Sequence, residues 1–194
     1  DPDVSLGHWM PDAAIEKLKT KLVQHRVKAV NYGVVGLPDD EAECRRVFEF
    51  ARKMGMYAVT SEPDPEAMGL IERLAREYDI RLAIHNHPRR DDAPGYRHWD
   101  PSYVLSLVKG RDARLGSCAD TGHWIRSGVE PLKALRMLKG RIVSLHLKDL
   151  NVFGPDGHDV PYGLVVANVA ALLSELRSQR FRGNVSIEYE HAWD

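Results

Sequence analysis

The sequence predicts an α/β fold of the (βα) barrel type, and two observations support this prediction. Helical and strand patterns alternate along the 194 residues, and strands joined by helices pair in parallel because parallel neighbours need crossover connections. One face of each expected strand begins with small residues and ends with polar ones. A strand between two helical layers would be almost continuously apolar, whereas a barrel has a narrow interior and a polar mouth.

The individual elements follow from their end signals and their apolar spacing. Helix starts carry proline or acidic residues, as at Pro11, Asp100 and Pro131, and glycine ends helices, as at Gly55 and Gly140. Apolar residues recur at helical spacing within the helices and alternate within the strands. In order, we expect a helix from 11, a strand over 27–35, a helix over 39–55, a strand over 57–62, a helix over 65–78, a strand over 81–87, a helix from 100, a strand over 114–120, a helix over 131–140, a strand over 142–149, a helix over 166–180 and a strand over 184–190.

Length and composition set the class of protein. A chain of 194 residues is expected to form one domain over residues 1–194. Eight-stranded barrels usually need about 250 residues, so we expect this chain to lack the first and the last strand unit, with completion of the barrel in some other way as the alternative. The content of 43% hydrophobic and 28% charged residues is that of a soluble globular protein. A net charge of −1 gives no broad attraction to nucleic acid or to anionic membranes, so neither is expected as a partner.

Location and redox state follow from what the sequence contains. No apolar run reaches the roughly 20 residues of a membrane helix, and residues 1–20 lack the pattern of a signal peptide, so we expect a cytoplasmic protein. Cys44 and Cys118 form neither a disulfide framework nor a Cys-x-x-Cys pair, and we expect both as small buried or half-buried groups. The sequence is compatible with a homo-oligomer.

Acidic and imidazole side chains stand at the expected carboxyl ends of four successive strands. A closed barrel would direct them to a common point. Mixed nitrogen and oxygen ligands suit Mn²⁺, Co²⁺, Zn²⁺ or Fe²⁺ better than Ca²⁺, and a cation would balance the crowded carboxylates. Taken singly, each of these residues also has a structural reading, such as a helix N-cap for the aspartate. The residues are His85 or His87, Asp120, His146, and Glu188 or Glu190.

Three motifs in this order resemble those of the sugar phosphate isomerase/epimerase family, whose members are xylose isomerase-like TIM barrels. They are ADTGHW at 119–124, SLHLKD at 144–149 and SIEYE at 186–190, and the similarity extends from about residue 27 to 191. In such proteins a Glu, an Asp, a His and a second Glu bind one divalent metal ion. The resemblance implies that Asp120, His146 and Glu188 are metal ligands and that His123 contacts the substrate.

One motif departs from the family pattern. The sequence IHNHP at 84–88 has His85 where many members carry the first metal-binding Glu. We expect His85 to be the fourth ligand, with Glu62 as the alternative carboxylate. Two-base epimerisation uses that first Glu together with the last one, so an imidazole at this position is as compatible with a cyclitol dehydratase or a keto-sugar lyase as with an epimerase.

The expected function is that of a divalent-metal-dependent sugar isomerase or epimerase. Proton abstraction next to the carbonyl of a ketose or keto-sugar would give a metal-bound enediolate. Mn²⁺ is the expected metal ion, and Co²⁺, Zn²⁺, Fe²⁺ and Mg²⁺ are the alternatives. Glu188, Glu190 and His87 are candidate bases. Lys148 either holds an oxyanion or pairs with Asp120 or a Glu. The alternatives are a dehydratase or lyase acting on a cyclitol or 3-keto-glycoside, a noncatalytic sugar-binding barrel, and an endonuclease, which the lack of excess positive charge disfavours.

Two loops are expected to shape the pocket for this sugar or cyclitol. Residues 88–100 form a long connection in which Trp99 could lie over a sugar ring or anchor the loop on the barrel rim. Residues 151–163 contain glycines and prolines that define turns, and they bring His158 within reach of substrate hydroxyls. We expect Glu62 to be a further substrate contact.

Overall fold

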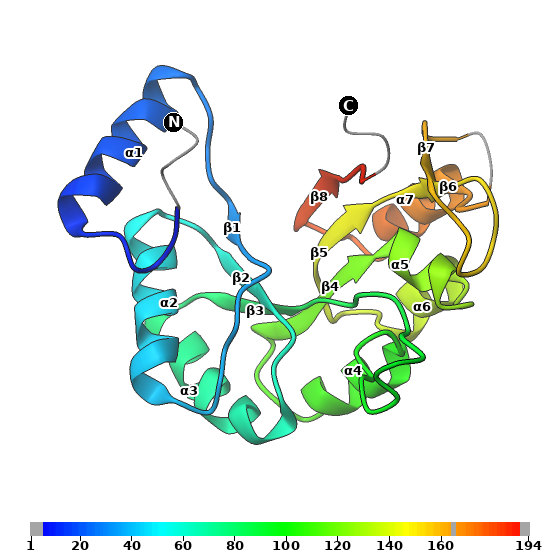
Figure 1. Ribbon diagram of the computed structural model, residues 1–194, viewed down its shortest axis with the longest axis horizontal. Helices are drawn as coiled ribbons and strands as arrows, with labels where there is room; N and C mark the ends of the chain where they lie inside the picture. Colours follow the sequence, from blue (N-terminus) through cyan, green and yellow to red (C-terminus); the bar gives the residue numbers. More distant parts are fainter. Residues whose placement is uncertain (1–5, 164–165, 191–194) are drawn as a thin grey trace. The chain divides into compact units, whose positions relative to one another are not determined.

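A computed structural model describes residues 6–163 and 166–190 of the chain. The contacts between its Cα atoms divide the chain into two compact units, Asp1–Leu82 and Ala83–Asp194 (Figure 1). This division does not test the expectation of one domain over residues 1–194, which stays a prediction.

The first unit repeats the predicted order of helix and strand. Strands β1 and β2 pair in parallel, with Asn31 opposite Ala58, and helices α2 and α3 pack side by side (Figure 1). The side chain of Asp40 accepts a hydrogen bond of 3.0 Å from the amide of Glu43 and so caps α2. The elements are α1 (Asp12–Gln24), β1 (Asn31–Tyr32), α2 (Glu41–Lys53), β2 (Ala58–Ser61), a 3₁₀ turn (Pro65–Ala67) and α3 (Met68–Tyr78).

The core of the first unit lies on the facing sides of its helices. Val47 and Phe48 of α2, and Ile71 and Leu74 of α3, are fully or almost fully buried. Val47 and Phe48 lie four and three positions before the buried Ala51, and Ile71 lies three before Leu74, which places each set on one side of its helix. The predicted apolar spacing therefore corresponds to the packed faces.

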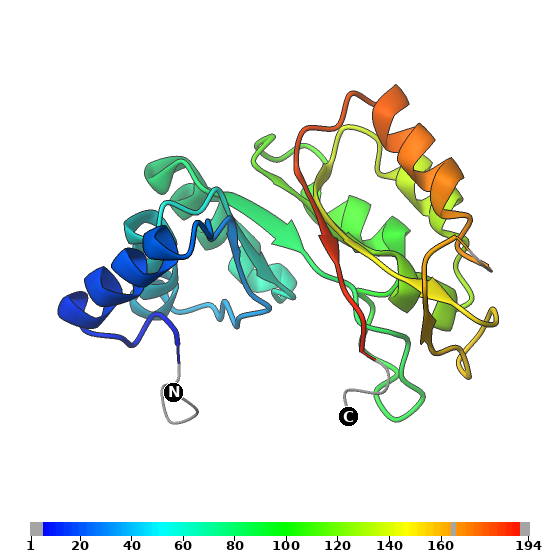
Figure 2. The same ribbon diagram turned by 90° about the horizontal axis from the view of Figure 1, so that it is seen from above.

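The second unit contains three strands that lie next to one another in the order β4, β5, β8 and pair in parallel. Figure 2 shows α4, α6 and α7 on one side of these strands. Strand β3 (Arg81–Ile84) crosses the boundary between the units. The other elements are α4 (Pro101–Val108), β4 (Leu115–Asp120), α5 (Thr121–Arg126), α6 (Pro131–Met137), β5 (Ile142–Leu147), the antiparallel pair β6 (Asp149–Leu150) and β7 (Asp159–Val160), α7 (Val169–Ser178) and β8 (Asn184–Ile187).

Several strands are shorter than predicted. The segment 27–35 forms a strand only at Asn31–Tyr32. At Gly33 a side chain would meet Thr60, because a Cβ there would lie 2.3 Å from the Thr60 carbonyl oxygen. Only glycine fits this close approach, and beyond it the amide of Val35 still donates to the Thr60 carbonyl at 3.0 Å.

The shortening also affects residues of the expected site. The strand predicted over 81–87 ends at Ile84, and the one predicted over 184–190 ends at Ile187. His85, His87, Glu188 and Glu190 therefore lie in the segments that follow strands. Helix α5 and the β6–β7 pair were not predicted, because elements of six and two residues are too short to show an apolar period.

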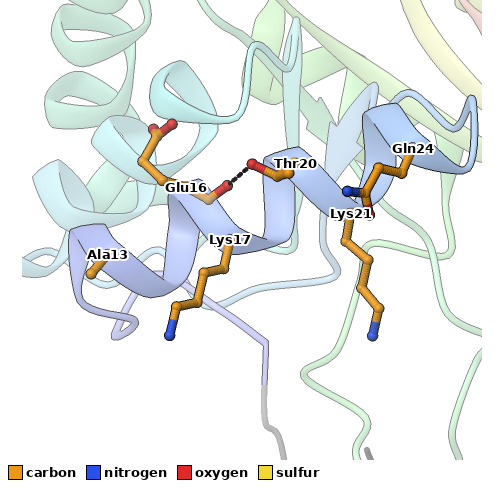
Figure 3. A pocket seen from close by; sticks show the side chains of 6 residues that line it. All are labelled: Ala13, Glu16, Lys17, Thr20, Lys21 and Gln24. Atoms are coloured by element: carbon orange, nitrogen blue, oxygen red, sulfur yellow. Dashed lines mark hydrogen bonds between the residues drawn. The ribbon is translucent and has the colours of Figure 1, made fainter.

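Two surface properties complete the description. None of the helices in the described part of the chain combines the length and apolarity that a membrane crossing demands. A hollow on α1 is lined by Ala13, Glu16, Lys17, Thr20, Lys21 and Gln24 (Figure 3). All its lining residues belong to one helix, so it offers a ligand only one wall.

Candidate functional site

Three polar side chains converge at the carboxyl ends of β4, β5 and β8. The parallel register sets Asp120 opposite His146 and His146 opposite Ser186, and Glu188 follows Ser186 by two residues. His146 Nδ1 lies 3.7 Å from Asp120 Oδ2 and 2.7 Å from Glu188 Oε2. One ligand atom from each of these residues can lie within 4.8 Å of the other two. We call Asp120, His146 and Glu188 the ligand group.

The ligand group has unsatisfied polar atoms. Asp120 Oδ2, His146 Nδ1 and Glu188 Oε2 are all buried, and among the described residues they make ion-pair contacts but no hydrogen bond. Buried polar atoms are almost always paired, so such a cluster needs an explanation. A divalent cation bound by two carboxylates and an imidazole would satisfy all three atoms, so these residues fit the metal that the sequence predicts.

Asp120 uses its two oxygens for different tasks. It is fully buried, and its Oδ1 accepts a hydrogen bond of 2.8 Å from the amide of His123, which caps α5. Its backbone is bound on the other side by Asn86, whose side chain accepts from the Asp120 amide and donates to the Asp120 carbonyl. The helix-cap reading and the ligand reading of Asp120 are therefore compatible, because one oxygen serves each.

Imidazole rings surround the same carboxylate. His85 Nε2 lies 3.7 Å from Asp120 Oδ2, and His123 Nε2 lies 3.5 Å from it. Both histidines are buried. The His85 ring also lies 5.2 Å from the His146 ring, centroid to centroid. His85 and His123 form a second candidate metal group with Asp120, in which one ligand atom of each residue lies within 4.8 Å of the other two.

Lys148 is fully buried beside these carboxylates. Its Nζ lies 2.6 Å from Glu190 Oε2, 3.1 Å from Asp120 Oδ2 and 3.5 Å from Glu188 Oε2. A buried ammonium must be paired to be stable. The contacts of Lys148 thus agree with the ion-pair interpretation. The same contacts hold Glu190 beside the ligand group.

Sequence reasoning missed one cation of this site. Arg126 ends α5, and its Nη2 lies 3.3 Å from Asp159 Oδ2, while its Nη1 lies 3.6 Å from Glu190 Oε2. Asp159 Oδ2 also accepts from the Glu190 amide at 2.9 Å. Asp120, His123 and Arg126 follow one another at intervals of three residues. This spacing would have placed Arg126 near the site only if a helix had been recognised there.

The charges shift the pKa values of the ligand group. Burial raises the pKa of Asp120, but His123, His146, His85 and Lys148 outweigh burial and hold the pKa well below its usual range. Burial disfavours the protonated form of His146, yet Asp120, Cys118 and Glu188 raise its pKa to about 12. Desolvation would raise the pKa of Glu188, but His146 and Lys148 lower it. The two carboxylates are therefore anionic and ready to bind a cation.

The neighbouring cationic groups respond differently. Burial lowers the pKa of His123 to about 3, because Lys148, His85 and Arg126 together with desolvation outweigh the attraction of Asp120. The pKa of Lys148 is raised, since Asp120, Glu190 and Glu188 outweigh its own desolvation. His123 is accordingly neutral and Lys148 charged near neutral pH.

The remaining predicted residues lie in varied surroundings. His87 is exposed, and its ring lies 4.5 Å from that of His85 and 5.4 Å from that of His123. Trp99 is half-buried and donates to the Tyr96 carbonyl in its own loop. The amide of His158 donates to Asn151, also in its own loop. Glu62 is half-buried just after β2, in the first unit. The roles expected for these side chains stay predictions.

A family model decides the identity of the fold. The model described as the xylose isomerase-like TIM barrel matches residues 6–193. The chain belongs to this family. The predicted fold class is therefore confirmed, and so is the resemblance that the ADTGHW, SLHLKD and SIEYE motifs carry.

Solved structures agree with the family. An uncharacterized protein from Parabacteroides distasonis is 35% identical, with a TM-score of 0.71, and the match covers 96% of this chain and 72% of that one. A D-psicose 3-epimerase crystallised with D-fructose is 14% identical, with a TM-score of 0.75 and coverage of 94% and 71%. A probable 3-DHS dehydratase of Bacillus anthracis is 14% identical, with a TM-score of 0.66 and coverage of 92% and 77%. Comparison with curated proteins finds no match.

Proposed function

We propose that this xylose isomerase-like barrel is a divalent-metal-dependent sugar isomerase or epimerase, which removes a proton next to the carbonyl of a ketose or keto-sugar. The observation that carries the proposal is the convergence of three buried polar atoms without a hydrogen bond in the ligand group. The similarity to a D-psicose 3-epimerase supports the same class of substrate.

Asp120, His146 and Glu188 would hold the ion, with His85 as the fourth ligand. Mixed nitrogen and oxygen ligands favour Mn²⁺ first, with Co²⁺, Zn²⁺, Fe²⁺ and Mg²⁺ as alternatives. When bound, such an ion acts as a Lewis acid on the carbonyl and the neighbouring hydroxyl of a sugar, and so makes the proton on the adjoining carbon more acidic.

Proton transfer is the task of the surrounding side chains. The exposed ring of His87 and the carboxylate of Glu188 are the candidate bases, because imidazole and carboxylate groups commonly serve as general bases in enzymes. Lys148 is already bound to Glu190 and lies 3.1 Å from Asp120 Oδ2. We therefore assign to Lys148 first the task of pairing with both carboxylates, and only second the task of binding a substrate oxygen.

One observation supports a second candidate function, elimination by a dehydratase or lyase. Two-base epimerisation needs a carboxylate at the position that His85 occupies, and the second unit has imidazoles of His85 and His87 there. One base and one acid are enough to remove a proton and expel a hydroxyl or glycosidic oxygen. The similarity to a probable dehydratase is compatible with this outcome.

The test combines metal analysis with turnover in deuterated water. We expect the purified protein to lose activity after chelation and to regain it when one equivalent of Mn²⁺ is added. Ketoses, inososes and 3-keto-glycosides would be offered as substrates. An isomerase or epimerase gives an isomeric product with deuterium next to the carbonyl, whereas a lyase gives an unsaturated product and releases water or an alcohol.

A matched pair of histidine variants controls for general damage. His146→Gln should abolish metal retention and turnover together, because His146 belongs to the ligand group. His25→Gln should change neither, since His25 is exposed after the end of α1. Full turnover by the chelated protein, or by His146→Gln, would contradict the proposed function.

A further inference from the structure

Arg126 connects three parts of the second unit through one guanidinium group. Its Nε donates to the Gly157 carbonyl at 3.0 Å, its Nη2 donates to Asp159 Oδ2 at 3.3 Å, and its Nη1 lies 3.2 Å from His123 Nδ1. Asp159 is buried and also accepts from the amide of Glu190. The guanidinium is therefore held in one orientation, with Nη1 directed at the imidazole of His123.

This contact determines where His123 carries its proton. A guanidinium has only donors, so a hydrogen bond between Arg126 and His123 requires Nδ1 to accept. An accepting Nδ1 has a free lone pair, and the ring proton of a neutral imidazole then resides on Nε2. A doubly protonated ring would bring two donors together at 3.2 Å.

Lys148 is the competing donor at the opposite edge of the ring. Its Nζ lies 3.3 Å from His123 Nε2, and a hydrogen bond there would require the other tautomer. Lys148 has stronger acceptors, however, at 2.6 Å in Glu190 and 3.1 Å in Asp120. Asp120 Oδ2 also lies 3.5 Å from Nε2, and its negative charge favours a proton on that nitrogen. The contacts on both sides therefore favour the proton on Nε2.

We propose that Arg126 is a positioning residue that keeps His123 Nδ1 as a hydrogen-bond acceptor, so that Nε2 carries the ring proton and donates a hydrogen bond to a sugar oxygen beside the ligand group. The tautomer follows from contacts within the chain alone. The identity of the acceptor as a sugar oxygen rests on the proposed function. In that chemistry, a donor fixed before the substrate arrives stabilises negative charge that develops on the oxygen.

The tautomer can be read directly from the nitrogen nuclei of the ring. Long-range ¹H–¹⁵N spectra of protein labelled at histidine, free and with Zn²⁺ added, distinguish protonated from unprotonated ring nitrogens, and His123→Gln identifies the signals of His123. We expect the wild-type protein to carry the proton on Nε2 with Nδ1 unprotonated at neutral pH. In Arg126→Met, Lys148 is the remaining cationic donor at the ring, so the proton should shift toward Nδ1.

Two further variants separate positioning from loss of charge. Asp159→Asn keeps the Arg126 donor, and we expect it to retain the wild-type pattern. Arg136→Met removes an exposed arginine of α6 that pairs with Glu175, and we expect no change at His123. With a turned-over sugar, Arg126→Met should lower kcat about tenfold, less than the roughly hundredfold loss expected for His123→Gln, since one donor of this kind is worth about 10²–10³.

Two results would overturn the proposal. One is a wild-type His123 that is protonated at Nδ1 or at both nitrogens. The other is a folded Arg126→Met with an unchanged pattern. If Arg126→Met does not fold, Arg126→Lys is the milder change to measure. The wild-type spectrum then decides where His123 carries its proton. If no sugar is turned over, the proposed function fails, whereas the spectra still decide the role of Arg126.

Discussion

At the scale of the residue, the site depends on carboxylates whose oxygens face different partners. Asp120 caps α5 with Oδ1 and presents Oδ2 to the imidazoles and Lys148. Glu188 and Glu190 stand two residues apart, and their carboxylates also face different partners. Glu188 faces His146, whereas Glu190 faces Lys148. Similar side chains therefore have distinct roles, which substitution can separate.

The first prediction separates the two tasks of Asp120. Asp120→Asn and Asp120→Ala should both abolish metal binding, because both remove the charge that faces His146. The amide oxygen of Asn can still accept from the His123 amide, so only Asp120→Ala loses the cap. We expect Asp120→Ala to have a free energy of unfolding about 1 kcal/mol lower than Asp120→Asn.

Urea unfolding of the two metal-free variants measures this difference, and metal analysis measures retention. Equal stability of the two variants would show that the cap contributes nothing. Metal retention by either variant would remove Asp120 from the ligand group.

The second prediction compares the two glutamates. Glu188→Gln should lower metal affinity by more than about 100-fold, because its Oε2 belongs to the ligand group. Glu190→Gln should lower it by about 10-fold at most, the lower end of what partners outside the ligand shell contribute. Calorimetric titration of Mn²⁺ measures both affinities. The reverse order of effects would exchange the roles of the two residues.

At the scale of the element, α5 packs directly onto the strand end that carries Lys148. Thr121 Oγ1 donates to the Lys148 carbonyl and accepts from the Lys148 amide, both at 2.9 Å. A Cβ on Gly122 would lie 2.7 Å from the Cβ of Lys148. The small residues of the ADTGHW motif therefore allow the helix to lie against β5 and its extension.

The third prediction uses two helical glycines as a matched pair. Gly122→Ala should destabilise the protein by about 1–3 kcal/mol, because the added methyl group forces Lys148 to move in a packed interior. Gly69→Ala in α3 should instead stabilise it by about 0.5–1 kcal/mol, since nothing lies within 4 Å of the new Cβ and alanine favours helix.

Thermal or urea unfolding of both variants tests this prediction. Equal shifts for the two variants would mean that α5 does not press on Lys148. Metal affinity should also fall only in Gly122→Ala, because Lys148 lies beside Asp120 and Glu188.

The same elements show how much of the fold and site the sequence could predict. Long helices such as α2 and α3 were predicted because their apolar residues recur over several turns. Asp120 and His146 were predicted together because each ends or nearly ends a strand with small or apolar residues before it. Because β4 and β5 are parallel neighbours, the residues at their carboxyl ends lie side by side.

Other features had no signal of this kind. Helix α5 is too short to show periodicity, so Arg126 could not be placed near His123. The β6–β7 pair, which positions Asp159, arises within a loop rich in turn residues. The pairing of Lys148 with Glu190 depends on side-chain directions beyond the end of β8, which the alternation of a strand no longer determines.

At the scale of the whole molecule, each compact unit contains one buried cysteine. Cys44 lies in α2 of the first unit and Cys118 in β4 of the second, and both are free and buried. Burial raises the pKa of Cys44 to about 11, with the charge of Asp40 adding to it. A buried thiol of this kind reacts with an alkylating reagent only after its surroundings open.

The fourth prediction uses these thiols to follow metal binding in each unit. The ligand group belongs entirely to the second unit. A free Mn²⁺ concentration about 100 times the Kd stabilises the bound state by about 2.7 kcal/mol, so alkylation of Cys118 should slow about 100-fold. We expect a smaller factor for Cys44, which is measured in the same samples by mass spectrometry of the two peptides. An equal slowing of alkylation at both cysteines would show that the units open together, as the expectation of one domain requires. If Mn²⁺ did not slow the alkylation of Cys118, the ion would bind elsewhere.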